Sequence, residues 1–373
     1  MLRLADFLAP HMRWALLFAL LQGQGLSATG DLPRSTPEME GVDSAVIDEF
    51  LTALENSPVV LHSFMLVRHG HVVAEGWWRP YGPEQLHPVY SLLKNFSATA
   101  AGLAIATHRL ALDDRIATWL SDQLPIVSSP NLASMKVRDL LTMTAGYAKD
   151  PLASQGPAIE RGEAIRTILA QPVPHVPGTY FAYSNGTALL LSAVLQKATG
   201  QTLHEFLKPR LLVPLGISGE EWEIYPEGLN PGGTGLKLRT EDIAKLAQLY
   251  LQKGRWNDAQ LLPEWWVRSA TTLQTPSHYG ANPDLRHGYG YMFWLAEGDA
   301  YRGYGSLDQN CLVLPAYDAV LVTTGANRDS PAHFRLIRDR LLPAFHEGKL
   351  PFNPSARARL EARFRSLNVR SNK

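Results

Sequence analysis

Hydrophobic residues follow helical spacing early in the chain and strand-like spacing soon afterwards. Residues 43–56 carry apolar side chains three and four positions apart, which predicts a helix. Residues 63–68 and 72–77 are apolar runs on either side of a turn at Gly70, a pattern typical of a β-hairpin. From 91 to 110 the pattern is again helical and rich in alanine. The chain therefore begins with mixed helix and strand.

The middle of the chain differs from both ends. Residues 112–285 show mostly helical patterns broken by proline and glycine, and β character returns at 287–294, 309–314 and 319–324. A last helix is predicted for 332–345. Because connections between neighbouring elements are normally short, we predict one antiparallel sheet flanked by helices, with an inserted helical lobe. The fold class is α/β, in the α+β sense.

This pattern divides the chain into four expected parts. They are a leader or disordered segment at 1–30, a sheet domain formed by 31–110 together with 286–350, a helical insertion lobe at 111–285, and a basic tail at 351–373. A run of arginines this close to the end of a chain is usually solvated. We therefore expect the tail to be exposed to solvent.

An apolar stretch near the N-terminus bears on localisation. Residues 14–21 follow Arg13 and resemble the apolar core of a secretory signal, and they are too few to span a bilayer. A start codon placed too far upstream would give a similar stretch. We expect a periplasmic or secreted protein if this leader is real and a cytoplasmic one otherwise, with no membrane insertion of the body.

Composition excludes several classes of protein. The 373 residues are 45% hydrophobic and 19% charged, which is typical of a globular chain and not of a disordered one. Lys and Arg together number 35, and Asp and Glu together also number 35. Because the positive and negative charges balance, nothing favours nucleic acid as a partner. The single cysteine, Cys311, excludes an internal disulfide and any Cys-x-x-Cys metal site. Its apolar neighbours predict a buried strand residue.

Common hydrolase motifs are absent. No Gly-x-Ser-x-Gly elbow occurs, because Ala182 stands at the first glycine position before Ser184. His204 and Glu205 are not followed by a second histidine at the spacing of the zinc pattern His-Glu-x-x-His. We expect neither a metal nor a cofactor.

One Ser-x-x-Lys sequence, Ser91 to Lys94, lies where an extended segment turns into a helix. Residues three apart share a helix face, which places the Lys94 side chain beside Ser91. A serine hydroxyl needs a base to become nucleophilic, and a desolvated lysine can act as that base. The amides at the start of a helix also favour a developing oxyanion.

A second motif, Tyr183-Ser184-Asn185, offers groups that complete such a site. The Tyr183 phenol can relay the proton to a leaving group, and Asn185 can hold Lys94 or the substrate. Structural alternatives remain for both motifs. Ser91 can serve as a helix cap and Lys94 as a solvated first-turn residue, and residues 183–185 can form an ordinary turn.

The chain resembles the serine β-lactamase-related hydrolases, which include class C β-lactamases, D-alanyl peptidases and family VIII esterases. It is most similar to the branch described as 6-aminohexanoate-dimer hydrolase-like. The matching stretches follow the family order over residues 34 to 330 and are 66–77, 90–97, 137–146, 181–185, 214–216, 235–238 and 287–290.

This resemblance implies a β-lactamase/transpeptidase-like fold with the active site between the sheet and the helical lobe. It also implies that Ser91 is the nucleophile, that Lys94 and Tyr183 form the acid/base pair and that Asn185 is a supporting polar group. Gly305, Ser306 and Leu307 then correspond to the strand that supplies the second oxyanion donor.

The third family motif departs from the pattern of β-lactamases, which carry Lys-Thr-Gly on this strand. No lysine is present between Tyr301 and Gln309. That cation normally holds a substrate carboxylate, so β-lactam turnover is not expected to be efficient. Arg302 is either a substitute anion anchor or solvent-exposed, and Asp308 stands where relatives often have glycine.

We therefore predict a metal-free serine esterase or amidase that cleaves a small substrate through an acyl-enzyme. Five aromatic residues are candidates for an apolar pocket, namely Trp77, Trp78, Tyr147, Tyr289 and Trp294. The alternatives are a β-lactamase or D-amino-acid peptidase and, from another class, a catalytically silent binding or sensor protein on the same fold. The oligomeric state does not follow from the sequence.

Overall fold

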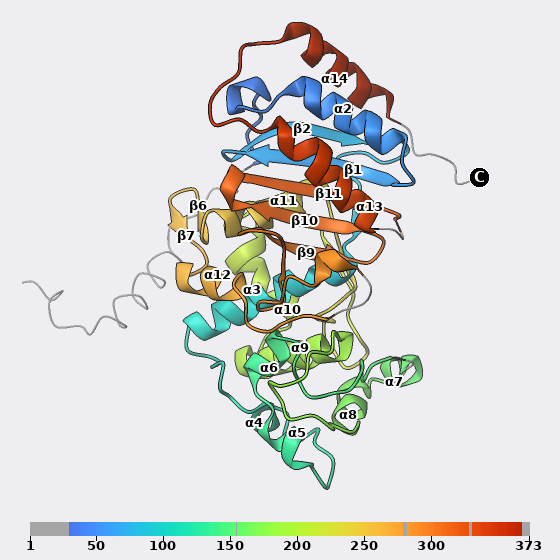
Figure 1. The fold of residues 1–373 in the computed structure, drawn as a ribbon. Helices are drawn as coiled ribbons and strands as arrows, with labels where there is room; N and C mark the ends of the chain where they lie inside the picture. Colours follow the sequence, from blue (N-terminus) through green and yellow to red (C-terminus); the bar gives the residue numbers. More distant parts are fainter. Residues whose placement is uncertain (1–29, 154, 279–281, 328–329, 368–373) are drawn as a thin grey trace, which may run out of the picture.

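Residues 30–153, 155–278, 282–327 and 330–367 are described by the computed structural model of the protein (Figure 1). Residues 1–29, which hold the predicted leader, lie outside this part of the chain, as do the last six residues of the predicted tail. The predicted localisation therefore stays a prediction.

A six-stranded antiparallel sheet is built from both ends of the described chain. Its strand order is β2-β1-β11-β10-β9-β8, so the N-terminal hairpin pairs directly with the C-terminal strands. The strands are β1 (Leu61–Arg68), β2 (His71–Trp77), β8 (Trp294–Leu295), β9 (Tyr301–Gly305), β10 (Gln309–Leu314) and β11 (Ala319–Gly325). The predicted sheet and its hairpin are confirmed.

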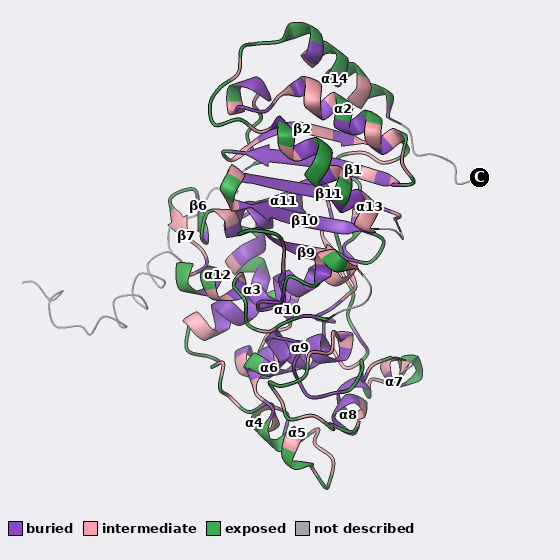
Figure 2. Ribbon diagram, viewed as in Figure 1, coloured by how far each residue is buried: buried purple, intermediate pink, exposed green. Residues whose placement is uncertain are grey.

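Both faces of this sheet are covered by helices, which is why its strands are buried throughout much of their length (Figure 2). Successive side chains of a strand point to opposite faces. Phe64 and Leu66 of β1 accordingly belong to one hydrophobic core, and Met65 and Val67 belong to a second one.

The first core lies under the terminal helices, at the top and front of Figure 1. These are α2 (Ser44–Glu55), α13 (Ser330–Leu336) with the π-helical turn Ile337–Leu341 that follows it, and α14 (Pro354–Ser366). The N-cap of α2 is Asp43, which accepts a hydrogen bond from the Ala45 amide. A side-chain acceptor at this position satisfies an otherwise unpaired helix amide. The helix predicted for residues 43–56 is confirmed.

The described part of the tail expected at 351–373 is largely exposed to solvent, but it forms a helix that packs on the sheet domain. Residues 354–366 form α14, which packs on α2 and buries Ala356 and Leu360. Arg363 of this helix pairs with Asp48 and Glu55 of α2. The sequence did not indicate this packing, because α14 buries only two apolar residues among many basic ones.

The second core continues from the sheet into the helical lobe without a break. Next to the sheet lie α3 (Leu93–Ala106), α11 (Thr240–Leu251) and α12 (Glu264–Ala270). The lobe, at the bottom of Figure 1, contains α4 (Ile116–Trp119), α5 (Pro130–Ser134), α6 (Val137–Leu141), α7 (Gly156–Glu160), α8 (Ala164–Leu169) and α9 (Asn185–Thr199), and α10 (Leu203–Leu207) packs against α3 and α9.

Two helices of this core position the candidate site. Helix α3 packs against both β9 and α9, so it joins the sheet to the centre of the lobe. Small secondary sheets fix the chain around it, formed by β3 (His87–Pro88), β5 (Leu236–Leu238) and β4 (Glu221–Trp222), and by β6 (Arg255–Trp256) with β7 (Ala259–Gln260). The start of α3 thus lies where sheet and lobe meet.

Candidate active site

Ser91 lies at the junction of a strand and a helix. Strand β3 pairs with β5, and a short 3-10 turn at Tyr90–Leu92 then leads into α3. Tyr90 has a φ of 47°, in the left-handed region that residues other than glycine usually avoid. Strained backbone of this kind is concentrated at functional sites. The N-cap of α3 is Leu92, so the Ser91 hydroxyl is not the group that caps this helix.

Lys94 lies on the first turn of α3 and has only 1% of its surface exposed. Its Nζ atom lies 3.2 Å from Ser91 Oγ, 2.6 Å from Asn185 Oδ1 and 3.2 Å from the carbonyl oxygen of Gly233. The alternative of a solvated lysine is therefore wrong. The structure instead places a buried amine within hydrogen-bonding distance of the serine hydroxyl.

Burial changes the protonation of this amine. Removing the ammonium form from water lowers the pKa of Lys94 to about 7, and the carboxylate of Asp150 acts in the opposite direction. A pKa near 7 leaves a large fraction of the side chain neutral at physiological pH. Only the neutral amine can accept a proton, so the site holds a usable base.

Tyr183 covers the other side of Lys94. The centroid of its ring lies 4.7 Å from Lys94 Nζ, a distance at which a cation is attracted by an aromatic face. The ring in turn packs against Trp294, with 5.1 Å between centroids, and edge-on against Tyr289 at 6.2 Å. These contacts fix Tyr183 beside the base.

Asn185 reaches Lys94 because of how α9 begins. The Ser184 hydroxyl caps the helix by accepting a hydrogen bond from the Thr187 amide and donates one to Asp150. Asp150 also accepts from the amides of Asn185 and Gly186 at 3.0 Å and 2.9 Å. The start of the helix is therefore fixed on both sides, and Asn185 is its first residue.

A glycine-rich loop borders the site and contacts both α3 and α9. The Gly232 carbonyl accepts a hydrogen bond from Ser97, and the Gly233 carbonyl accepts one from Lys94. A Cβ atom on Gly233 would lie 2.9 Å from Asn185 Oδ1 and 3.1 Å from Lys94 Nζ. The position needs glycine because the loop backbone has to approach the lysine this closely.

Strand β9 passes directly beside the segment that carries Ser91. A Cβ atom on Gly305 would lie 2.2 Å from the carbonyl oxygen of Val89, and one on Gly303 would lie 2.0 Å from Asn95 Oδ1. Gly305 is thus brought next to the segment that carries Ser91. Ser306 and Leu307 follow it in an exposed turn, and their role as oxyanion donors remains a proposal.

Asp308, the next residue of this turn, holds it in place through buried hydrogen bonds. Its side chain is fully buried and accepts hydrogen bonds from Asn310 Nδ2, from Asn327 Nδ2 at 3.0 Å and from His333 Nδ1 at 2.7 Å. Burial works to raise the pKa of Asp308, but the facing His333 and these hydrogen bonds outweigh it and lower the pKa. The carboxylate therefore stays ionised in the interior and ties β9 and β10 to α13.

Neither expectation for Arg302 is right. The side chain is buried, with its guanidinium 3.9 Å from the centroid of the Phe334 ring and a hydrogen bond to the carbonyl of Asp284. Alternation along β9 explains this position, because Gly303 and Gly305 face α3 and Arg302 faces α13. Arg302 is therefore neither exposed to solvent nor directed at Ser91.

The five aromatic candidates separate into two groups. Tyr289 and Trp294 lie at the site and form a cluster with Tyr183 and Phe181, whose ring centroid is 5.4 Å from that of Tyr289. Phe181 was not among the five, although it precedes Tyr183 by two residues. Tyr289 and Trp294 are buried in the core, and they support the partly exposed rings of Phe181 and Tyr183 from behind.

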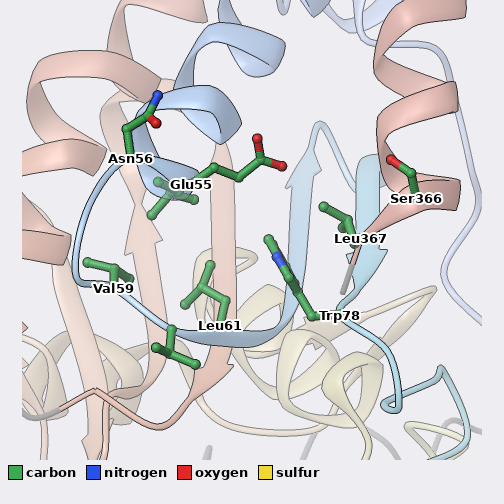
Figure 3. A pocket seen from close by; sticks show the side chains of 9 residues that line it. Glu55, Asn56, Val59, Leu61, Trp78, Ser366 and Leu367 are labelled. Carbon is green, nitrogen blue, oxygen red and sulfur yellow. The ribbon is translucent and has the colours of Figure 1, made fainter. Parts of the chain in front are cut away.

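Three of the five expectations are wrong. Trp77 and Trp78 lie at the end of β2, which the sheet order places four strands from β9. Trp78 instead lines a separate cavity together with Leu61 and Leu367 (Figure 3). Tyr147 is a core residue whose hydroxyl donates to the carbonyl of Ile168.

A Ser-x-x-Lys pair at the start of a helix, a Tyr-x-Asn segment at the start of a second one and a facing antiparallel strand together define the architecture of serine hydrolases that use a lysine base. The chain belongs to the Beta-lactamase family, whose model matches residues 62–343. The resemblance and the fold class expected from the sequence are thereby confirmed.

Curated relatives of the chain are distant in sequence. A "Putative D-alanyl-D-alanine carboxypeptidase" of Escherichia coli (strain K12) is 23% identical over 271 residues, which are 57% of this chain and 59% of that protein. A "D-aminopeptidase" of Brucella anthropi is 25% identical over 168 residues, covering 42% and 31% of the two chains. The chain thus spans less than two thirds of the length of these relatives.

Solved structures show the same fold. A "Putative 6-aminohexanoate-dimer hydrolase" from Bacillus anthracis superposes with a TM-score of 0.69 at 19% identity, covering 87% of this chain and 90% of that one. A family VIII carboxylesterase gives 0.64 at 15% identity, with 84% and 99% covered. "EstCE1, a hydrolase with promiscuous acyltransferase activity" gives 0.64 at 17%, with 80% and 97% covered.

Two further observations concern metals and membranes. Within the described ranges, no group of His, Cys, Asp and Glu side chains is arranged to hold a metal ion. In the same part of the chain, no helix combines the length and the apolar character that crossing a bilayer requires.

The Asp308 cluster leads to a prediction about stability. Asp308→Ala leaves the buried donors of Asn310, Asn327 and His333 without their acceptor, which we expect to lower the free energy of unfolding by about 3–5 kcal/mol at pH 7. Urea denaturation measures it, with the exposed Glu297→Ala as control. Because the pKa of Asp308 is lowered, the stabilisation is present at neutral pH and is lost as pH falls through the folded-state value. Equal unfolding midpoints for the two variants at pH 7 would contradict the assignment.

Proposed function

We propose that this protein is a serine hydrolase that cleaves a small ester or amide through an acyl-enzyme on Ser91. The observation that carries the proposal is the buried Lys94 amine, 3.2 Å from Ser91 Oγ and with its pKa lowered to about 7. A base matched to neutral pH and within hydrogen-bonding distance of a hydroxyl is what nucleophilic activation requires.

In the first half of the reaction, neutral Lys94 accepts the Ser91 proton while Oγ forms a bond to the substrate carbonyl carbon. The backbone amides of Ser91 and of the strand around Gly305–Leu307 stabilise the oxyanion. The proton then passes from the Lys94 ammonium, through the Tyr183 hydroxyl, to the leaving alcohol or amine. Breaking the bond to that group leaves the acyl-enzyme.

In the second half, water takes the place of the leaving group. Tyr183 and Lys94 accept one proton from the water as its oxygen attacks the acyl carbon. The tetrahedral intermediate collapses with cleavage of the bond to Ser91 Oγ, which recovers a proton from Lys94. Asn185 and the Gly233 carbonyl hold Lys94 in place through both halves.

The similar proteins support this class of reaction without fixing the substrate. The similar solved structures include a 6-aminohexanoate-dimer hydrolase and a family VIII carboxylesterase, and the curated relatives include a D-alanyl-D-alanine carboxypeptidase and a D-aminopeptidase. Cleavage of an ester or an amide bond is what these names have in common.

The surroundings of Ser91 favour a neutral substrate over an anionic one. Strand β9 presents glycines to the site, while its only cation, Arg302, is held on the opposite face against Phe334. The partly exposed rings of Phe181 and Tyr183, which pack on the buried Tyr289 and Trp294, offer apolar contact. These features argue against the β-lactamase or D-peptidase alternative, whose substrates carry a carboxylate.

Removal of the nucleophile tests the proposal. We expect Ser91→Ala to abolish both fluorophosphonate labelling and hydrolysis of p-nitrophenyl butyrate, with a loss of at least about 10³-fold in kcat because no other hydroxyl replaces the acyl-forming step. Intact-mass spectrometry and initial rates provide the measurements, and the exposed Ser134→Ala on α5 is the matched control. Activity that survives in Ser91→Ala would show that the nucleophile lies elsewhere. A wild-type protein that neither labels nor hydrolyses would favour the silent binding protein.

The Lys94 pKa sets the expected pH profile. Since only the neutral amine accepts the Ser91 proton, kcat/KM should rise about tenfold per pH unit below pH 7 and level off above it. Initial rates from pH 5 to 9 measure this, and Lys94→Met should lower the rate by about 10²–10⁴-fold. The exposed Lys197→Met serves as control. A flat profile, with a solvent isotope effect showing that proton transfer limits the rate, would exclude Lys94 as the base.

The absence of a cation on the inner face of β9 predicts discrimination by substrate charge. We expect kcat/KM for p-nitrophenyl butyrate to exceed that for p-nitrophenyl hemisuccinate by about tenfold or more, because the carboxylate loses hydration without gaining a partner. Spontaneous hydrolysis of the two esters gives the reference rates. A preference for the hemisuccinate, or turnover of nitrocefin as fast as that of the ester, would favour the β-lactamase alternative.

A further inference from the structure

Asp150 is a carboxylate that the sequence motifs did not include, and it lies at the start of α9. It accepts four hydrogen bonds, from the Ser184 hydroxyl at 2.9 Å and from the amides of Asn185, Gly186 and Leu152 at 3.0 Å, 2.9 Å and 3.1 Å. Two of these donors belong to the first turn of the helix. The carboxylate therefore has one fixed orientation beside the residue that binds Lys94.

Among the residues that the structure describes, no anion is a direct hydrogen-bond partner of Lys94. Its ammonium donates to a hydroxyl, to an amide oxygen and to a backbone carbonyl, all of which are uncharged. The titratable side chains around it are Tyr183, whose ring covers the amine, and Asp150. A buried charge without compensation is costly, so the protonated state of Lys94 depends on this one carboxylate.

The position of Lys94 near the start of α9 increases its need for a nearby negative charge. The N-terminus of a helix carries a partial positive charge, which disfavours a cation placed beside it. Asn185, the first residue of α9, lies between that terminus and Lys94, with its backbone amide on Asp150 and its side-chain oxygen on Lys94. Asp150 thus neutralises the helix terminus and fixes the residue that holds the base.

We propose that Asp150 is a positioning residue that holds Asn185 against Lys94 and supplies the negative charge that balances the ammonium formed when Lys94 accepts the Ser91 proton. This inference rests on the proposed function, since it concerns the same base. It assigns to Asp150 a role in proton transfer in addition to its role in capping α9.

The two roles differ in what they do to the pH profile. Asp150→Asn keeps the shape of the side chain and removes its charge, so the Lys94 ammonium loses its compensation and the amine deprotonates more easily. We expect the midpoint of the pH profile of kcat/KM to move down by about half to one pH unit, and kcat at pH 8 to fall about tenfold. The pH dependence of the rate of fluorophosphonate labelling at Ser91 should move by the same amount.

Two comparison variants separate charge from structure. Ser184→Ala removes the hydroxyl that caps α9 and contacts Asp150. It should lower the melting temperature but leave the pH midpoint in place. Glu160→Gln removes one exposed carboxylate from α7 of the same lobe, and should change neither. If Asp150→Asn does not fold, Asp150→Ser provides a second neutral side chain whose oxygen can still accept from the helix amides.

The outcomes distinguish this inference from the function on which it rests. A downward shift in a neutral Asp150 variant, with Ser184→Ala unshifted, supports the charge role. Wild-type labelling of Ser91 with identical midpoints in wild type and Asp150→Asn would overturn the role of Asp150 and leave the hydrolase assignment intact. Equal shifts in Asp150→Asn and Ser184→Ala would also overturn it, because the effect would then come from the helix start. Failure of Ser91 to label in the wild type overturns both.

Discussion

The candidate site depends on the burial of a single amine. Lys94 has almost no exposed surface, and its nitrogen is held between Ser91, Asn185 and the carbonyl of Gly233. Each of these partners comes from a different part of the chain, and each is needed because an amine without partners is costly to bury. The requirement to satisfy Lys94 therefore specifies how α3, α9 and the glycine loop meet, and the same burial brings its pKa to about 7.

The fold supplies this junction by joining its two halves through one core. Helix α3 packs on β9 and on α9, so the residue that begins it is placed by the sheet and by the lobe together. Close approach is possible because glycine stands at the contact points, at Gly233 against Lys94 and at Gly305 against Val89. Small residues at these positions let backbone reach the site, where any side chain would separate the two halves.

The sequence predicted the parts of the site that are local and missed those that depend on tertiary contacts. Residues three apart on a helix share a face, so the approach of Lys94 to Ser91 followed from spacing alone. Asp150 and Gly233 reach the site only through folding, from a loop and from a turn that share no motif with Ser91. Arg302 was misjudged because the face to which β9 directs it depends on strand register, which composition does not reveal.

The turn after β9, which corresponds to the third family motif, also depends on residues that are distant in the sequence. Leu307 and Asp308 both have left-handed backbone, with φ values of 59° and 72°, and such a pair is unfavourable for residues other than glycine. The turn nevertheless keeps this shape because the Asp308 carboxylate is bound by Asn327 after β11 and by His333 of α13. A buried, hydrogen-bonded carboxylate offsets this backbone strain. The position of β9 beside Ser91 is thus maintained from the opposite face of the sheet.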